Sequence, residues 1–152
     1  MNLELKIIPP VQLIISAALM VSLATYLPQY HFALSVRLPV IILLILLASS
    51  IGILALYDFH KHQTTFHPHT PEKTSTVVDT GVFAYSRNPM YLSLALTLIA
   101  LGVYLQNYSS FIIIPLFILY ITRFQIIPEE KMLDKLFPKD YQAYCQKVRR
   151  WL

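Results

Sequence analysis

Charged residues are scarce in this chain, and their scarcity is the most informative feature of its composition. Only 13% of the 152 residues are charged, whereas 56% are apolar and the mean hydropathy is +0.56. A soluble domain usually carries about a quarter charged residues. The composition therefore argues against a soluble enzyme, a disordered tail and a nucleic-acid-binding protein, and it favours a small integral membrane protein.

Glycine and cysteine are also rare. The only glycines are Gly52, Gly81 and Gly102, so the clustered glycines of a phosphate-binding loop or a dinucleotide fingerprint are absent. The single cysteine, Cys145, excludes an intrachain disulfide and a cysteine-rich zinc site. The length of the chain allows one domain, which we take as residues 1–152.

Long stretches without charge show where the chain crosses the membrane. No charged residue occurs in 38–57 or in 88–122. A spanning helix needs about 20 apolar residues, so the first stretch fits one helix and the second fits two, with the polar residues 106–109 between them. A further apolar run extends from Val11 to Leu27. The sequence thus predicts an all-α membrane bundle with four spans, at about 10–28, 38–57, 89–106 and 109–127.

Lysine and arginine are distributed unevenly between the two sides of these spans. Arg37 alone lies in the loops of one side, and the other eleven lie on the opposite side. The excess of positive charge in cytoplasmic loops predicts that both termini, the loop 58–88 and the C-terminal segment 128–152 are cytoplasmic. The net charge of +4 then lies on one face, which suits an anionic leaflet.

The C-terminal segment is amphipathic. Its apolar residues recur at helical spacing: Leu133, Leu136, Phe137, Tyr141, Tyr144, Val148 and Trp151. Pro138 interrupts this pattern, because proline disfavours helix at the preceding residue and is a good first residue of a new helix. We expect two short helices, at about 128–136 and 138–149, along the membrane interface.

The segment Arg87-Asn88-Pro89-Met90-Tyr91 has a structural and a functional interpretation. Structurally, Asn88 is an N-cap, Pro89 is the first residue of the third span, and Arg87 and Tyr91 anchor at the interface. Functionally, Arg87 is a cation beside a helix N-terminus. Both features would bind the carboxylate or phosphate of a ligand.

Glu129 and Glu130, which follow Pro128, also allow two interpretations. Acidic residues in the first turn of a helix complement its dipole. Adjacent carboxylates at the end of a membrane helix are, however, costly to desolvate, and they would be useful for holding ribose hydroxyls, an amine or a cationic centre. Arg123, the only charge near the inner end of the fourth span, either reaches the interface or orients an anionic acceptor or pairs with Glu129.

Four histidines of the 58–88 loop, His60, His62, His67 and His69, form two His-x-His pairs. No acidic or cysteine ligand has a suitable spacing to complete a zinc site. We expect solvated loop histidines and no metal. The aromatic residues Tyr141, Tyr144 and Trp151 either anchor the C-terminal segment at the membrane or form the wall of a pocket for a heterocycle.

In chain order these segments resemble the isoprenylcysteine carboxyl methyltransferase family, in its small prokaryotic branch. The wider group also includes the phospholipid N-methyltransferases. The specific part is the Arg-Asn-Pro-x-Tyr motif at 87–91 and the Glu-Glu-x-x-Leu motif at 129–133, one helical hairpin apart. The resemblance covers residues 60–152. It includes the segments 64–68, 79–83, 86–91, 128–133, 137–144 and 148–151.

The resemblance implies an S-adenosylmethionine-dependent methyltransferase of the prokaryotic inner membrane. It implies that the cofactor binds at the cytoplasmic face, near Gly81, Arg87, Asn88, Pro89, Tyr91, Glu129, Glu130, Tyr141 and Tyr144. A lipophilic acceptor with a carboxylate, thiol or amine would enter from the bilayer. Catalytic roles would fall to Glu130, as base for an amine acceptor, and to Arg123.

The chain departs from the family pattern at Phe137-Pro138, where relatives often have Phe-Gly. Two other classes of function remain open at this point. One is a non-catalytic helical membrane subunit or lipid-binding protein. The other is a membrane reductase with a phosphorylated nicotinamide cofactor, which would require a larger basic cluster around Arg87.

Overall fold

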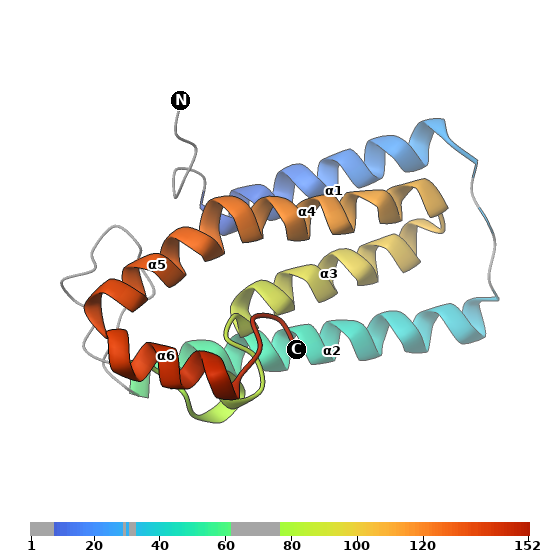
Figure 1. Ribbon diagram of the computed structural model, residues 1–152. Helices are drawn as coiled ribbons and strands as arrows, with labels where there is room; N and C mark the ends of the chain where they lie inside the picture. The colour runs from blue at the N-terminus through green and yellow to red at the C-terminus, as the bar shows by residue number, and fades with distance from the viewer. Residues whose placement is uncertain (1–7, 29, 31–32, 62–76) are drawn as a thin grey trace.

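Four long helices run side by side in the computed structural model, which describes residues 8–28, 30, 33–61 and 77–152 (Figure 1). The first three are α1 (Pro9–Tyr26), α2 (Leu34–Lys61) and α3 (Pro89–Leu105), and the fourth is built around α4 (Ile113–Ile121). No strand occurs among the residues described, so the predicted all-α class is confirmed.

The fourth long helix is continuous across several helical forms. It begins as the 3-10 turn η3 (Tyr108–Ile112), becomes α4, widens into the π-helical turn η4 (Thr122–Ile126) and continues as α5 (Ile127–Leu136). The last helix, α6 (Pro138–Lys147), folds back against α5. The two C-terminal helices were predicted at nearly these bounds, but α5 was expected to be separate from the span and is joined to it.

The π turn provides the physical reason for this continuity. Pro128 has no N–H and usually ends a helix or occupies its first turn. In η4 the Ile127 N–H donates to the carbonyl of Thr122, five residues back, so the wider turn leads directly into the proline. Single π turns of this kind occur frequently at functional sites.

Within the described parts of the chain, three helices are long and apolar enough to cross a membrane: Pro9–Tyr26, Leu34–Lys61 and Tyr108–Leu136. The third predicted span, which is α3, is apolar but has 17 residues. Its length of about 25 Å lies at the lower end of what a bilayer core requires. It ends at Leu105 because Gln106 adopts the left-handed conformation (φ 52°), which turns the chain into η3.

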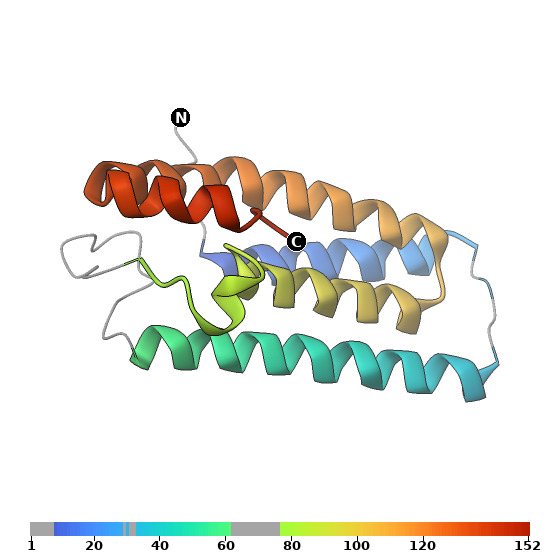
Figure 2. The ribbon, with the colours of Figure 1, turned by 60° about the horizontal axis from the view of Figure 1, so that its bottom comes forward.

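The central helix of the bundle is α3, which packs against α1, α2 and α4 (Figures 1 and 2). The main core lies between α1, α3 and the fourth long helix: Met20, Ala95, Leu98, Ile114, Phe117, Ile121 and Ile126. A second cluster joins the end of α2 to η2 (Gly81–Ala84) and α6: Ala55, Val78, Phe83, Tyr141, Tyr144 and Val148. This second cluster fixes the segment that leads into α3.

A buried polar network closes the bundle at the α3–η3 turn. Asn107 is fully buried, and its amide nitrogen donates to the carbonyls of Leu27 (3.1 Å) and Pro28 (2.9 Å). Its side-chain oxygen accepts from the N–H (3.0 Å) and the hydroxyl (3.3 Å) of Ser110. The Ser110 hydroxyl also donates to the carbonyl of Met20 at 2.9 Å, so its single hydrogen is shared between two acceptors. Both polar atoms of the Asn107 side chain therefore have partners.

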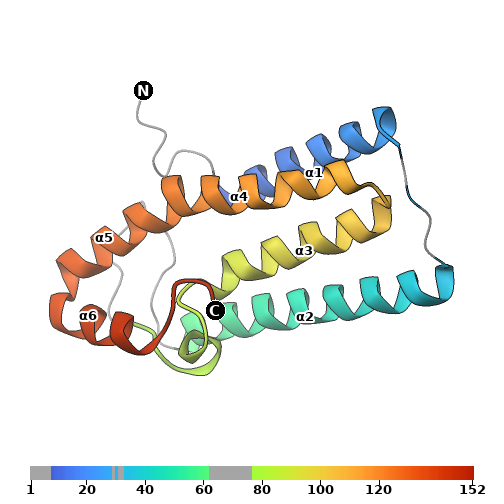
Figure 3. The same cartoon turned by 45° about the vertical axis from the view of Figure 1, so that its right-hand side comes forward.

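The opposite end of the bundle carries the residues singled out from the sequence. The start of α1, the end of α2, the start of α3 and the α5–α6 hairpin all lie at this end (Figure 3). Segments far apart in the chain therefore meet where the sequence predicted the cytoplasmic face.

Candidate functional site

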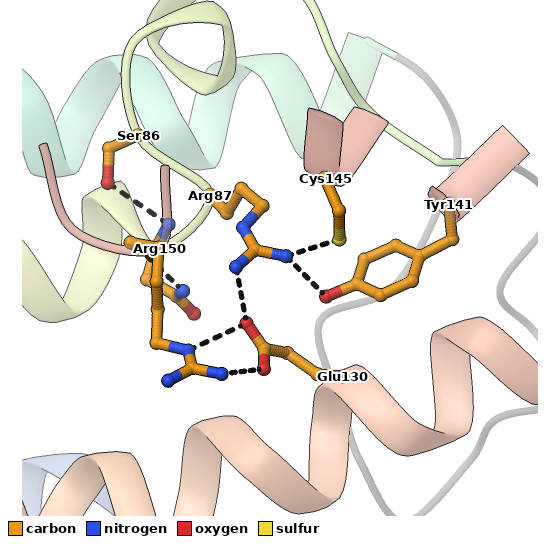
Figure 4. A network of polar contacts seen from close by, with 7 residues as sticks. Ser86, Arg87, Glu130, Tyr141, Cys145 and Arg150 are labelled. Carbon is orange, nitrogen blue, oxygen red and sulfur yellow. Dashed lines mark hydrogen bonds and ion pairs between the residues drawn. The ribbon is translucent and has the colours of Figure 1, made fainter. Parts of the chain in front are cut away.

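Arg87 lies at the centre of a charged cluster just before α3 (Figure 4). One guanidinium nitrogen, Nη2, lies 3.2 Å from the carboxylate of Glu130. The other, Nη1, donates to the hydroxyl of Tyr141 at 3.4 Å and to the sulfur of Cys145. Its Nε is buried and has no hydrogen-bond partner among the residues described. The cluster thus fixes Arg87 and leaves one of its donors unused.

Glu130 is shared between two guanidinium groups. Arg150 donates to it twice, from Nε at 3.0 Å and from Nη2 at 2.7 Å, which is the bidentate geometry that arginine forms with carboxylates. The hydrogen bonds to Glu130 raise the pKa of Arg150 above its usual value. Two positive groups facing one carboxylate leave the cluster with a net positive charge, which would attract a further anionic group.

The C-terminal tail, residues 148–152 after α6, holds this cluster together through its backbone. The Arg87 N–H donates to the carbonyl of Arg149 at 3.0 Å, and the side-chain amide of Asn88 donates to the carbonyl of Arg150 at 3.0 Å. Asn88 is the N-cap residue of α3, as expected, but within the described chain its side chain forms no capping hydrogen bond. The side chain of Asn88 binds the carbonyl of Arg150 instead, so the predicted N-cap position is confirmed.

Glu129 has different partners from Glu130, although the two residues are adjacent. Its Oε1 accepts from the hydroxyl of Tyr91 and from the side-chain amide of Gln125, both at 2.7 Å. Both donors are neutral. The Gln125 Oε1 and the Thr122 hydroxyl are buried in or beside the π turn without a hydrogen-bond partner in the described part of the chain.

Tyr141 and Tyr144 are buried between α6 and η2, at 5% and 6% exposure. The Tyr144 hydroxyl donates to the carbonyl of Phe83 at 2.7 Å and so ties α6 to η2. Burial raises the pKa of both phenols, and the Glu130 carboxylate raises that of Tyr141 further. The two tyrosines therefore act as neutral hydroxyl groups. Stacking of a ligand ring on either of them stays a prediction.

The remaining predicted residues lie around this cluster. Pro89 is a buried first residue of α3, as the sequence indicated. Gly81 begins η2 with φ +60° and lies against Asp58, near the end of α2. Arg123 occupies an exposed position in the π turn, with its guanidinium 5.4 Å from the ring of Phe124. Its catalytic role is untested by these contacts and stays a prediction.

The predicted histidine loop lies mostly outside the described residues. His60 is in the last turn of α2, whereas His62, His67 and His69 fall in the segment 62–76, which is outside the structure's description. Among the residues that are described, no three His, Cys, Asp or Glu side chains are grouped as metal ligands.

Sequence reasoning missed four residues of the site: Asp58, Gln125, Cys145 and Arg150. The sequence shows Arg150 as one of several basic residues near the C-terminus. Its role becomes visible only in the fold, where the C-terminal tail packs against residues 86–88. Gln125 gave a usable signal, because a glutamine one helical turn before Glu129 faces it. Cys145 and Tyr141 likewise lie one turn apart on the face of α6 that meets Arg87.

Comparison with known proteins decides the family. The family model for phospholipid methyltransferases matches residues 36–140, which is more than half of the chain. The chain belongs to the phospholipid methyltransferase family. An uncharacterized protein of Haemophilus influenzae is 48% identical over 63 residues, which are 41% of this chain and all of that protein. No solved structure matches the chain.

Phospholipid methyltransferases are membrane enzymes that use S-adenosylmethionine, so this family membership makes the chain a membrane methyltransferase. The apolar helices of the bundle agree with that location. The match includes Arg87, Glu129 and Glu130 and ends just before Tyr141. Arg150 and the rest of the tail therefore lie beyond the matched region, although they complete the charged cluster.

Proposed function

We propose that this chain transfers a methyl group from S-adenosylmethionine to a lipophilic acceptor, at the end of the bundle that carries Arg87, Glu130 and Arg150. The observation that carries this proposal is the cluster in which two guanidinium groups share one carboxylate, inside a chain of the phospholipid methyltransferase family. The family supports a methyltransferase over a non-catalytic subunit or a nicotinamide-dependent reductase.

The residues of this cluster fit the chemical groups of the donor. S-adenosylmethionine has a carboxylate, an amino group, ribose hydroxyls and a sulfonium, and when bound it supplies the methyl group. The unpartnered Arg87 Nε and the excess positive charge suit the carboxylate. Glu129, whose two donors are neutral, suits a cationic or amine group. Gly81, Asn88, Pro89, Tyr91, Tyr141 and Tyr144 would shape the surrounding site.

The contacts suggest a division of roles between the two glutamates. Glu130 binds both Arg87 and Arg150, so we assign it the role of orienting these cations. An amine acceptor must lose a proton before it attacks the methyl group, whereas a carboxylate or thiolate does not. Glu129 is the better placed of the two to take up that proton, because its donors are neutral. Methyl transfer in line also requires alignment and exclusion of water.

The site lies at the end of the bundle for which the distribution of lysine and arginine predicts a cytoplasmic location. The site lies at the end of the bundle where α1 starts and the α5–α6 hairpin lies (Figure 1). We propose that this end is cytoplasmic, with both termini on that side, and that the acceptor reaches it from the bilayer. Fusing a reporter that is active only in the cytoplasm to the C-terminus would test this. An inactive fusion, together with activity of a second reporter that works only outside the cytoplasm, would contradict the proposed orientation.

The activity is tested by methyl transfer into membrane lipids. Purified protein in nanodiscs of bacterial lipid extract is incubated with S-adenosylmethionine that carries a deuterated methyl group, and the lipids are analysed by mass spectrometry. We expect a labelled lipophilic product, and the masses identify a methyl ester, thioether or amine. Glu130→Gln should abolish most of the label, and Asp134→Asn, an exposed acid on the same helix, should not. Equal labelling by native chain and Glu130→Gln would contradict the proposal.

A further inference from the structure

Asp58 is an acidic residue in an unfavourable position, near the C-terminal end of α2. The carbonyl groups at a helix C-terminus carry partial negative charge, so a carboxylate there is destabilising unless other groups compensate it. The residue is only 9% exposed, so water does little to compensate it. Its position therefore requires partners from outside the helix.

Those partners come from the start of η2. The Val82 N–H donates to Asp58 Oδ2 at 3.2 Å. Gly81 lies so close that a Cβ atom built on it would be 2.1 Å from the same oxygen. Gly81 also has φ +60°, a conformation that favours glycine. The close approach and the backbone conformation thus both explain why residue 81 is glycine.

The contact with Asp58 fixes one end of a short segment whose other end is Arg87. Between them, the Phe83 carbonyl accepts from Tyr144, and the Phe83 ring lies edge-on to Phe59 of α2 at 4.9 Å. The Arg87 N–H then donates to the tail. The path from Gly81 to Arg87 is therefore held at its start, its middle and its end.

We propose that Asp58 is a positioning residue that acts through Arg87. Its carboxylate holds the start of η2, so that the guanidinium of Arg87 lies against Glu130 and Arg150 in the geometry that binds the methyl donor. This inference rests on the proposed function for the identity of the ligand. The placement of the 81–87 segment can be measured without any ligand.

The first test is hydrogen–deuterium exchange of the native chain and of Asp58→Ala in nanodiscs. We expect the backbone amides of residues 82–87 to exchange at least ten-fold faster in the variant, while those of α3 and α4 stay unchanged. Gly81→Ala, which disturbs the same contact from the other side and leaves Asp58 intact, should give the same pattern. Asp134→Ala serves as the control. Native exchange rates in both test variants would overturn the proposal.

The second test measures calorimetric binding of S-adenosylhomocysteine, the demethylated product of the donor. Asp58→Ala should weaken binding five- to ten-fold when Arg87 is present and less than two-fold in the Arg87→Gln background. A general structural defect would weaken binding equally in both backgrounds, which would overturn the positioning role and leave the proposed function intact. A native chain that fails to bind this product would instead overturn the proposed function, and with it the assignment of Asp58 to donor binding.

Discussion

Both ends of the bundle contain polar side chains, but the two ends differ in charge, burial and hydrogen bonding. At the Asn107 end, both polar atoms of the asparagine side chain have partners, these partners are neutral and the side chain is fully buried. At the Arg87 end, the groups are charged and partly exposed, and buried polar atoms of Arg87, Thr122 and Gln125 have no partner within the described residues.

We interpret this difference as that between a structural network and the proposed binding site. A buried polar group that is fully hydrogen-bonded stabilises one arrangement of the chain and has no capacity for a ligand. Buried groups without partners are costly in the folded chain and are rare, and they keep the capacity to bind a further group. We therefore expect substitutions at the Asn107 end to change stability, and substitutions at the Arg87 end to change ligand affinity.

The largest effect should come from Asn107→Leu. This change removes the donor to the carbonyls of Leu27 and Pro28 and one of the acceptors of Ser110, at a cost of about 3 kcal/mol in the free energy of unfolding. Thermal unfolding in one detergent would measure it, with Gln142→Leu, an exposed amide on α6, as the control. A loss no larger than that of the control would show that the network is dispensable.

Glu130→Gln should give the largest effect on ligand affinity. Removing the carboxylate that orients both arginines should weaken binding of S-adenosylhomocysteine at least ten-fold, which is about 1.4 kcal/mol. The melting temperature should fall as well, because the Arg87 and Glu130 side chains are only 13% and 15% exposed and the substitution leaves Arg87 without its carboxylate. Calorimetry with Asp134→Asn as the matched control measures this, and a large loss of stability without loss of affinity would reverse the assignment of the two ends.

Arg150→Gln should have a smaller effect than Glu130→Gln. The Arg150 side chain is 39% exposed, so its pairing with Glu130 is screened by solvent. We expect a three- to six-fold loss of affinity. Arg149→Gln removes a neighbouring positive charge from an exposed position, and it should change affinity less than two-fold. Equal effects of the two would indicate that only the net charge of the tail matters.

Substitutions of the two buried tyrosines should have smaller effects, and these effects should differ between the two positions. Tyr144→Phe removes the donor to the Phe83 carbonyl and should cost about 1 kcal/mol of stability. Tyr141→Phe removes a longer contact of 3.4 Å to Arg87, and it should change stability less and affinity about two-fold. Unfolding and binding measured on both variants would test this. The same result for both would contradict the separate roles given to them.

Much of the fold could be predicted from the sequence, because the stretches without charge mark the middle of the long helices. The second span was predicted at 38–57, but α2 continues beyond this stretch at both ends, over Arg37 and over Asp58. The starts of α3 and α6 follow from Pro89 and Pro138, which are good first residues of a helix. The continuity of α4 with α5 could not be predicted, because the π turn η4 lets the helix continue into Pro128. Sequence patterns rarely distinguish such a turn from the end of a helix.

The site was predictable in its residue types and less so in its pairings. Arg87 and Glu130 were both identified, but their ion pair depends on the packing of α5 beside α3, and no local pattern gives that packing. Asn88 looked like a cap, since asparagine favours that position, yet its side chain binds the tail carbonyl of Arg150. Asp58 was missed because the predicted span ended at residue 57, which placed this acid in a loop, and only the fold brings η2 against it.

The central claim is that the Arg87 end binds the methyl donor and the Asn107 end only maintains the fold. The most direct measurement is calorimetric binding of S-adenosylhomocysteine, in one nanodisc preparation, to the native chain, Arg87→Gln and Asn107→Ser, each below its melting temperature. We expect micromolar binding by the native chain, at least ten-fold weaker binding by Arg87→Gln, and native affinity in Asn107→Ser despite a lower melting temperature. Native affinity in Arg87→Gln would contradict the account.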